Sequence, residues 1–256
     1  MEENQLPASP EPSRHLHLAQ VQVRAGNEAQ NYHVPWSILD TWLGVGLLAV
    51  LFVVLVFALL IGLIDERLIQ SAGILLIELI FLLPVFLILA WRKIHWKLLG
   101  FGKFPLKTIG IGIVLLLAGY MIIIPHNYLL YELGVDTQGD QIFKIFNNLE
   151  SPAWFIVAGA LIAPVVEEIF FRGFLFQGLR QKYGWAVAIL LSSFIFAAAH
   201  LDPVAFIPTL VLGCVLAFMY HISNSVWPGI IFHFGINSFG LCALYLTSQY
   251  PGLIPS

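Results

Sequence analysis

The sequence predicts an all-α protein, a polytopic transmembrane bundle of about seven helices, within a range of six to eight. Hydrophobic residues make up 59% of the 256 residues and charged residues only 11%, whereas soluble domains contain about 25% charged residues. The mean hydropathy is +0.87. One buried core of this size cannot hold so many apolar residues, so we expect lipid to cover the outside of the protein. The expected location is therefore the cell membrane.

The apolar residues also fall into long runs that only helices can carry across lipid, because an open strand leaves its backbone groups unpaired there. Most runs reach the roughly 20 residues that cross about 30 Å of hydrocarbon. The fifth and sixth runs are shorter and lie on either side of Pro203 and Pro208, so they form either two crossings or one irregular stretch. In order, the runs cover about residues 41–64, 68–90, 108–130, 153–176, 185–200, 204–220 and 226–247.

The runs divide the chain into three parts. Residues 1–36 are rich in proline and polar residues, so we expect a disordered, cytoplasmic tail without a cleaved signal peptide. Residues 37–131 contain the N-terminal transmembrane helices, and residues 150–247 contain the remaining four runs. No basic stripe with interleaved aromatic residues is present, so we expect no nucleic-acid partner.

Lys and Arg residues in the short loops predict the orientation. The loops after the second and fourth runs are basic, and the loop between the third and fourth runs is acidic. We therefore expect the tail and both basic loops in the cytoplasm, and an odd number of crossings then places the C-terminus outside. The basic loops contain Arg92, Lys93, Lys97, Lys103, Lys107, Arg180 and Lys182, and the opposite side contains Arg67 and Lys144.

Few polar residues interrupt the apolar runs, and a charge at mid-bilayer costs at least about 2.5 kcal/mol, so each needs a reason to be there. Glu78 stands alone in the second run, and the sequence offers no explanation for it. The remaining residues are Glu167, Glu168 and Arg172 in the fourth run, His200 at the end of the fifth, and His233 and Asn237 in the seventh.

Spacing predicts how these residues are arranged. Glu168 and Arg172 are four residues apart and can form an ion pair, which leaves Glu167 available about 100° around the helix. A hairpin that turns at residues 183–184 would bring Glu167 and His200 to the same level. His233 and Asn237 share one helix face at a comparable depth. We therefore expect the three stretches to converge on one site near the cytoplasmic surface.

Two chemistries fit such a site. A carboxylate and one histidine could activate a water molecule while the second histidine and the asparagine stabilise an oxyanion. Alternatively, Glu167, His200 and His233 could bind zinc with water in the fourth position. The sequence lacks both the HExxH zinc motif and the GxSxG nucleophile motif. Structural alternatives also stay open: an ordinary ion pair for Glu168 and Arg172, a helix-end histidine at position 200, and interhelical hydrogen bonds from His233 and Asn237.

Three motifs in order, EEIFFR, FAAAH and HFGIN, resemble those of the CAAX-protease and bacteriocin-processing (CPBP or Abi) family of intramembrane endopeptidases. The resemblance implies a catalytic membrane domain over residues 150–247. It also implies Glu167, His200, His233 and Asn237 as catalytic residues with Glu168 and Arg172 as supporting ones, acting with zinc or without any cofactor. The expected substrate is a hydrophobic or lipid-modified peptide that enters from the membrane lipid. The alternatives are a non-catalytic scaffold or immunity protein of the same fold, and a transporter.

Overall fold

A computed structural model describes residues 33–63, 73–149 and 152–250 of the chain. This described part is all helical and contains no strand. Five of its helices are long and apolar enough to cross a membrane, and two shorter apolar helices accompany them, Ile77–Trp91 and Trp185–Ala199. The predicted all-α transmembrane bundle is therefore confirmed, and the protein is a multi-pass membrane protein.

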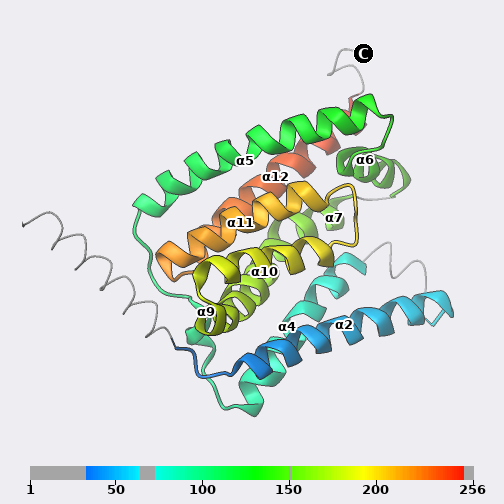
Figure 1. The fold of residues 1–256 in the computed structure, drawn as a ribbon. Helices are drawn as coiled ribbons and strands as arrows, with labels where there is room; N and C mark the ends of the chain where they lie inside the picture. Colours follow the sequence, from blue (N-terminus) through cyan, green and yellow to red (C-terminus); the bar gives the residue numbers. More distant parts are fainter. Residues whose placement is uncertain (1–32, 64–72, 150–151, 251–256) are drawn as a thin grey trace, which may run out of the picture. The chain divides into compact units, whose positions relative to one another are not determined.

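The apolar helices follow the predicted runs (Figure 1). The fifth and sixth runs form two separate helices that pack against each other, so they are not one irregular stretch. We predicted a disordered tail over residues 1–36, and residues 1–32 lie outside the described part of the chain. The first helices are α2 (Ile38–Leu60), α4 (Ile74–Trp91) and α5 (Lys107–Glu132), and the last are α10 (Trp185–Ala199), α11 (Phe206–Ser223) and α12 (Trp227–Gln249).

The fourth run forms one long helix, Ala153–Tyr183, in which α-helical and π-helical parts alternate. A π-helix has hydrogen bonds from residue i to i+5, is rare, and often occurs at functional sites. Its second π-helical part is the most deeply buried stretch of this helix, because α2, α4, α10 and α11 all pack against it. In order, the parts are α7 (Ala153–Val157), η3 (Ala158–Ile162), α8 (Ala163–Glu167), η4 (Glu168–Phe176) and α9 (Gln177–Tyr183).

The four phenylalanines of η4, Phe170, Phe171, Phe174 and Phe176, are at most 1% exposed. They form edge-on or tilted ring contacts with one another and with neighbouring helices. These four side chains therefore pack inside the bundle. The hydrophobic core of the protein is centred on η4.

A further helix, α6 (Gln138–Asn148), lies in the acidic loop between the third and fourth runs, where no helix was predicted. Thr137 and Asp140 form a capping box at its start. Hydrogen bonds from the Thr137 side chain and backbone hold the pKa of Asp140 below its usual value. The apolar side of α6 packs through Phe146 against Leu241 of α12.

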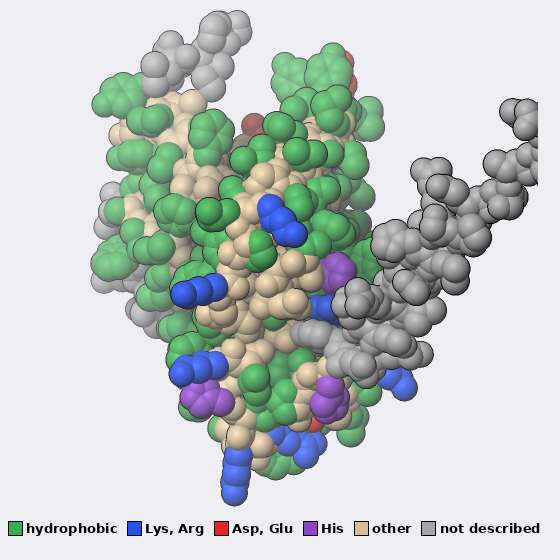
Figure 2. All heavy atoms as spheres, turned by 90° about the vertical axis from the view of Figure 1, so that its left-hand side faces the viewer, with side chains coloured by type: hydrophobic (Ala, Val, Ile, Leu, Met, Phe, Trp, Pro, Cys, Tyr) green, Lys and Arg blue, Asp and Glu red, His purple; other side chains and the backbone are tan. Residues whose placement is uncertain are grey.

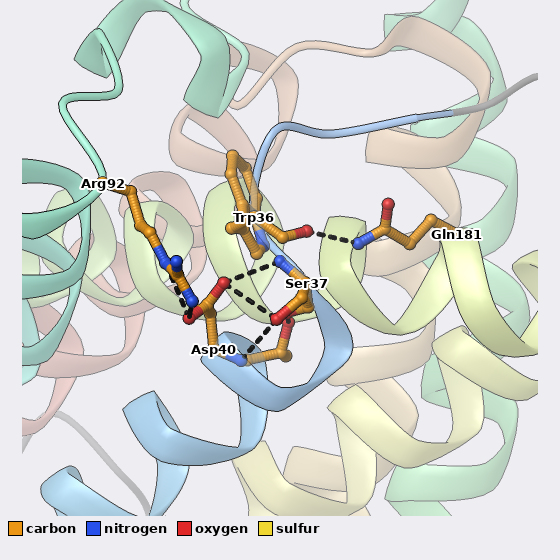
Figure 3. A network of polar contacts seen from close by, with 6 residues as sticks. Trp36, Ser37, Asp40, Arg92 and Gln181 are labelled. Carbon is orange, nitrogen blue, oxygen red and sulfur yellow. Dashed lines mark hydrogen bonds and ion pairs between the residues drawn. The ribbon is translucent and has the colours of Figure 1, made fainter.

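A polar network joins three helices at one end of the bundle (Figure 3). The Asp40 carboxylate accepts hydrogen bonds from the backbone N–H of Ser37 and from the Arg92 guanidinium, at 2.8 and 2.7 Å. Gln181 of α9 donates to the carbonyl oxygen of Trp36 at 2.6 Å, and the Trp36 ring stacks on Phe174. The start of α2 is thus fastened to the end of α4 and to α9.

Both basic loops lie at this same end, which Figure 2 views directly. Most of the charged side chains visible there belong to Lys or Arg. The Arg180 guanidinium donates to the Asn224 side chain at 2.8 Å, and the Ser225 hydroxyl donates to the Gly102 carbonyl oxygen at 2.7 Å, so both basic regions contact the loop between α11 and α12. That this end faces the cytoplasm stays a prediction.

Candidate active site

Two adjacent carboxylates stand at the junction of α8 and η4. The Glu167 side chain is almost fully buried and that of Glu168 completely so. Glu168 forms the predicted ion pair with Arg172, with 2.8 Å between Oε1 and Nη1. Oε2 of Glu167 has no hydrogen-bond partner within the described part of the chain. One carboxylate is therefore neutralised by a neighbour on its own helix, and the other retains a buried oxygen that can accept a proton.

Neighbouring helices fix the position of Arg172. Its Nη2 lies 3.3 Å from the carbonyl oxygen of Gly213 on α11, and its guanidinium stands 4.3 Å above the centre of the Phe196 ring. The cation thus has a carboxylate, a carbonyl and an aromatic face around it, which offsets part of the cost of burying it. The pair cannot turn without disturbing α10 and α11.

His233 of α12 lies between the two carboxylates. Its Nε2 is 3.7 Å from Oε2 of Glu167, and its Nδ1 is 3.4 Å from Oε1 of Glu168. This approach needs Gly229, one turn earlier on α12, because a Cβ atom there would collide with Oε2 of Glu168. The structure therefore brings together the predicted residues of the fourth and seventh runs.

His200 ends α10 and is half-buried. Its Nδ1 lies 2.8 Å from the carbonyl oxygen of Phe196, and a carbonyl oxygen can only accept, so Nδ1 carries the proton. In the neutral ring, Nε2 then has a free lone pair, as a general base requires. The Phe196 ring connects His200 to the carboxylate cluster, with ring centres 4.8 Å from His200 and 5.9 Å from His233.

Asn237 lies one turn after His233 and donates from Nδ2 to the carbonyl oxygen of Gly159 at 2.9 Å. The reason lies in η3. There the backbone N–H of Ala163 bonds the carbonyl oxygen of Ala158, and the next N–H in this pattern would come from residue 164. That residue is proline and has no N–H, so the oxygen of Gly159 loses its helical partner. Asn237 replaces it and keeps a second amide hydrogen for another acceptor.

The predicted zinc ligands do not form a metal site in this arrangement. Within the described part of the chain, no group of three His, Cys, Asp or Glu side chains is placed to hold a metal ion. Glu167 and His233 approach one another, but the recorded contacts of His200 are with Phe196. The donor set therefore does not fit a bound zinc ion.

Comparison with known proteins finds two similarities, which both include this part of the chain. Residues 149–239 match the family described as Type II CAAX prenyl endopeptidase Rce1-like. This segment is therefore similar to an Rce1-like membrane peptidase. All six predicted site residues lie inside the matched segment. The chain is also 25% identical over 180 residues to "Putative membrane peptidase YdiL" of Bacillus subtilis strain 168, covering 68% of this chain and 73% of that protein. No solved structure matches the chain.

Two residues that contact the predicted site residues were not recognised in the sequence. Phe196, whose ring contacts Arg172, His200 and His233, is an ordinary apolar residue of its run. Gly229 has no chemistry of its own, and only its closeness to Glu168 reveals it. Glu78 of α4, for which the sequence offers no explanation, is 8% exposed, and its Oε2 has no hydrogen-bond partner within the described part of the chain.

Proposed function

We propose that this protein is an intramembrane endopeptidase that hydrolyses a peptide bond of a hydrophobic or lipid-modified peptide. The observation that carries the proposal is the position of His233 between Glu167 and Glu168, in a segment that matches a peptidase family. A buried carboxylate, an imidazole and a second histidine next to an amide make up the groups needed for hydrolysis without a covalent intermediate.

Each residue has one role in the proposal. Glu167 and Nε2 of His200 accept the protons of the water molecule whose oxygen attacks the carbonyl carbon. Asn237 donates its second amide hydrogen to the oxygen that becomes negative, and His233 donates to it from Nε2 in the form of the ring that has a proton on Nε2. The distance from Nε2 of His233 to Glu167 exceeds hydrogen-bond length, which leaves this nitrogen available to the substrate. Glu168 and Arg172 hold the His233 ring from its other side.

An apolar groove beside His200 supports the proposed substrate class. The groove has a volume of about 560 Å³ and lies between α2 and the end of α10. Its α2 wall includes Leu48, Phe52 and Val56, and its α10 wall includes Ala199 and Leu201, which flank His200 in the chain. Almost all of its lining is apolar, so an acyl, prenyl or apolar side chain can bind there without losing hydrogen bonds to water.

The test is cleavage by the purified full-length protein in liposomes. Two quenched fluorescent probes are used: a peptide with a prenylated cysteine followed by three residues, and an apolar peptide without a lipid. Wild-type protein should cleave one of them, and Glu167→Gln should reduce kcat by at least about 100-fold, since it removes the base. Glu132→Gln, an exposed carboxyl at the end of α5, is the matched control and should cleave normally.

The outcomes separate the alternatives. Undiminished cleavage by Glu167→Gln would overturn the proposed mechanism. Failure of the wild-type protein to cleave either probe would favour the non-catalytic scaffold of the same fold. Activity that persists after complete removal of metal by a chelator agrees with the geometry, and activity that returns only with zinc would contradict it. Cleavage of the prenylated probe alone would indicate that the groove binds the prenyl chain of the substrate.

A further inference from the structure

Pro164 is a buried residue, three positions before Glu167, to which the proposed mechanism gives no role. It belongs to the first turn of α8, directly after the π-helical part η3. Proline has no backbone N–H, so it cannot bond a carbonyl oxygen of the preceding turn. The register of the helix at this point decides which carbonyl oxygen is affected.

The affected oxygen is that of Gly159. In an α-helical register its partner would be the N–H of Ala163, but this N–H bonds the carbonyl oxygen of Ala158. In a π-helical register its partner would be the N–H of residue 164, which proline lacks. The Gly159 oxygen therefore has neither an α-helical nor a π-helical partner in its own helix.

Helix α12 supplies the missing partner. An unpaired carbonyl oxygen is costly inside a membrane, so a group from a neighbouring helix commonly bonds to it. Here the Asn237 side chain donates from Nδ2 at 2.9 Å. Glycine at position 159 lets the two helices come close, because a Cβ atom there would stand 3.1 Å from Cδ1 of Leu241, one turn after Asn237. The hydrogen bond is therefore part of the packing of α12 on η3.

This hydrogen bond restricts the amide group that the proposed mechanism uses as an oxyanion donor. A free asparagine amide turns easily about its last side-chain torsion. With one N–H held on a backbone carbonyl oxygen, the plane of the amide is fixed and the second N–H keeps a single direction. Donors that are aligned before the reaction stabilise developing charge without reorganisation.

We propose that Pro164 is a positioning residue of the active site, which acts through Asn237. By withholding a backbone N–H, it reserves the Gly159 oxygen for the Asn237 amide and so orients the oxyanion donor. A residue with an N–H at position 164 would bond the Gly159 oxygen along the helix axis and turn it away from Asn237. This inference rests on the proposed function.

The test compares Pro164→Ala with Pro125→Ala, a matched control at an exposed proline inside α5. The liposome assay uses whichever of the two probes the wild-type protein cleaves. Pro164→Ala should lower kcat by about tenfold or more while KM changes little. Its melting temperature should not fall, because alanine supplies a backbone N–H and favours helix, so unfolding cannot explain the loss. Pro125→Ala should retain the wild-type kcat.

A double-mutant cycle shows whether Pro164 acts through Asn237. Asn237→Ala alone should lower kcat by about 100-fold, because it removes one oxyanion donor. Adding Pro164→Ala to that variant should lower kcat by less than about twofold more, since the donor that it positions is already gone. Losses that multiply in the double variant would overturn the proposal for Pro164.

A second measurement does not depend on activity. In NMR spectra of the protein labelled with nitrogen-15, the side-chain amide signal of Asn237 is identified by its loss in Asn237→Ala. Pro164→Ala should shift this signal upfield, because its hydrogen bond weakens, whereas Pro125→Ala should leave it in place. An unchanged signal in Pro164→Ala would overturn the proposal for Pro164. Continued cleavage by Glu167→Gln would instead overturn the proposed function, and the NMR result would still decide whether Pro164 controls the Asn237 hydrogen bond.

Discussion

At the scale of single residues, the buried pair of Glu168 and Arg172 shows what spacing can and cannot predict. Four residues of separation predict that the two side chains meet, and they do, at 2.8 Å. The same spacing does not reveal that Gly213, Phe196 and Gly229 surround the pair, because these residues come from three other positions in the chain. Local partners can be predicted from the sequence, whereas partners from other helices follow from packing.

The pair leads to a prediction on stability. Replacing Arg172 by Met leaves Glu168 buried without its cation, so the free energy of unfolding should fall by about 3–5 kcal/mol. The double variant Glu168→Gln and Arg172→Met removes both charges and should lose less than Arg172→Met alone. Thermal unfolding in detergent, followed by circular dichroism, measures both. A double variant less stable than Arg172→Met would contradict the expectation.

At the scale of helices, the existence and order of the apolar helices could be predicted from the sequence, but the internal geometry of each helix could not. The seven apolar runs correspond to the seven apolar helices found in residues 33–63, 73–149 and 152–250, because length and hydropathy suffice to identify helices in lipid. The π-helical parts η3 and η4 were not predicted, since they depend on which neighbours accept and donate hydrogen bonds. Helix α6 was missed because hydropathy was the criterion, although Thr137 and Asp140 have the spacing of a capping box.

The contact between α12 and η4 gives a prediction for a pair of glycines on one helix. Gly229→Ala should push α12 away from Glu168, separate His233 from Glu167, and lower both stability and kcat. Gly235→Ala is the matched control, because a Cβ atom at Gly235 meets no atom within 4 Å. That control should be neutral or up to about 1 kcal/mol stabilising, since alanine favours helix.

Thermal unfolding and the liposome cleavage assay measure both glycine variants. Equal behaviour of the two would show that the close approach at Gly229 is not required for the site.

At the scale of the whole molecule, charge predicts orientation. All seven basic residues of the two predicted cytoplasmic loops belong to the end of the bundle where α2, α5 and α12 begin. Sequence could predict that these loops share a side, because Lys and Arg are retained in the cytoplasm. It could not predict the network of Asp40, Arg92 and Gln181, because these residues are far apart in the chain and approach only after the helices pack.

The orientation is tested with single cysteines introduced at Lys103 and at Asp136 after Cys214 and Cys242 have been replaced by alanine. In intact cells, a membrane-impermeant maleimide should label position 136 and leave position 103 unlabelled until the cells are opened. The reverse labelling would place the basic end outside and contradict the predicted topology.

The π-helical geometry of η4 also constrains how the length of this chain can change. A π-turn contains more residues than an α-turn over a similar rise. Each of the nine residues from Glu168 to Phe176 therefore turns the chain through a smaller angle than a residue of an α-helix does. Loss of one residue there would allow a π-turn to revert to an α-turn, which absorbs the deletion, whereas loss of one residue from the α-helical part α9 would rotate everything after it by about 100° relative to Glu167. A one-codon deletion in η4 should therefore disturb the alignment of the following hairpin with the carboxylates less than the same deletion in α9.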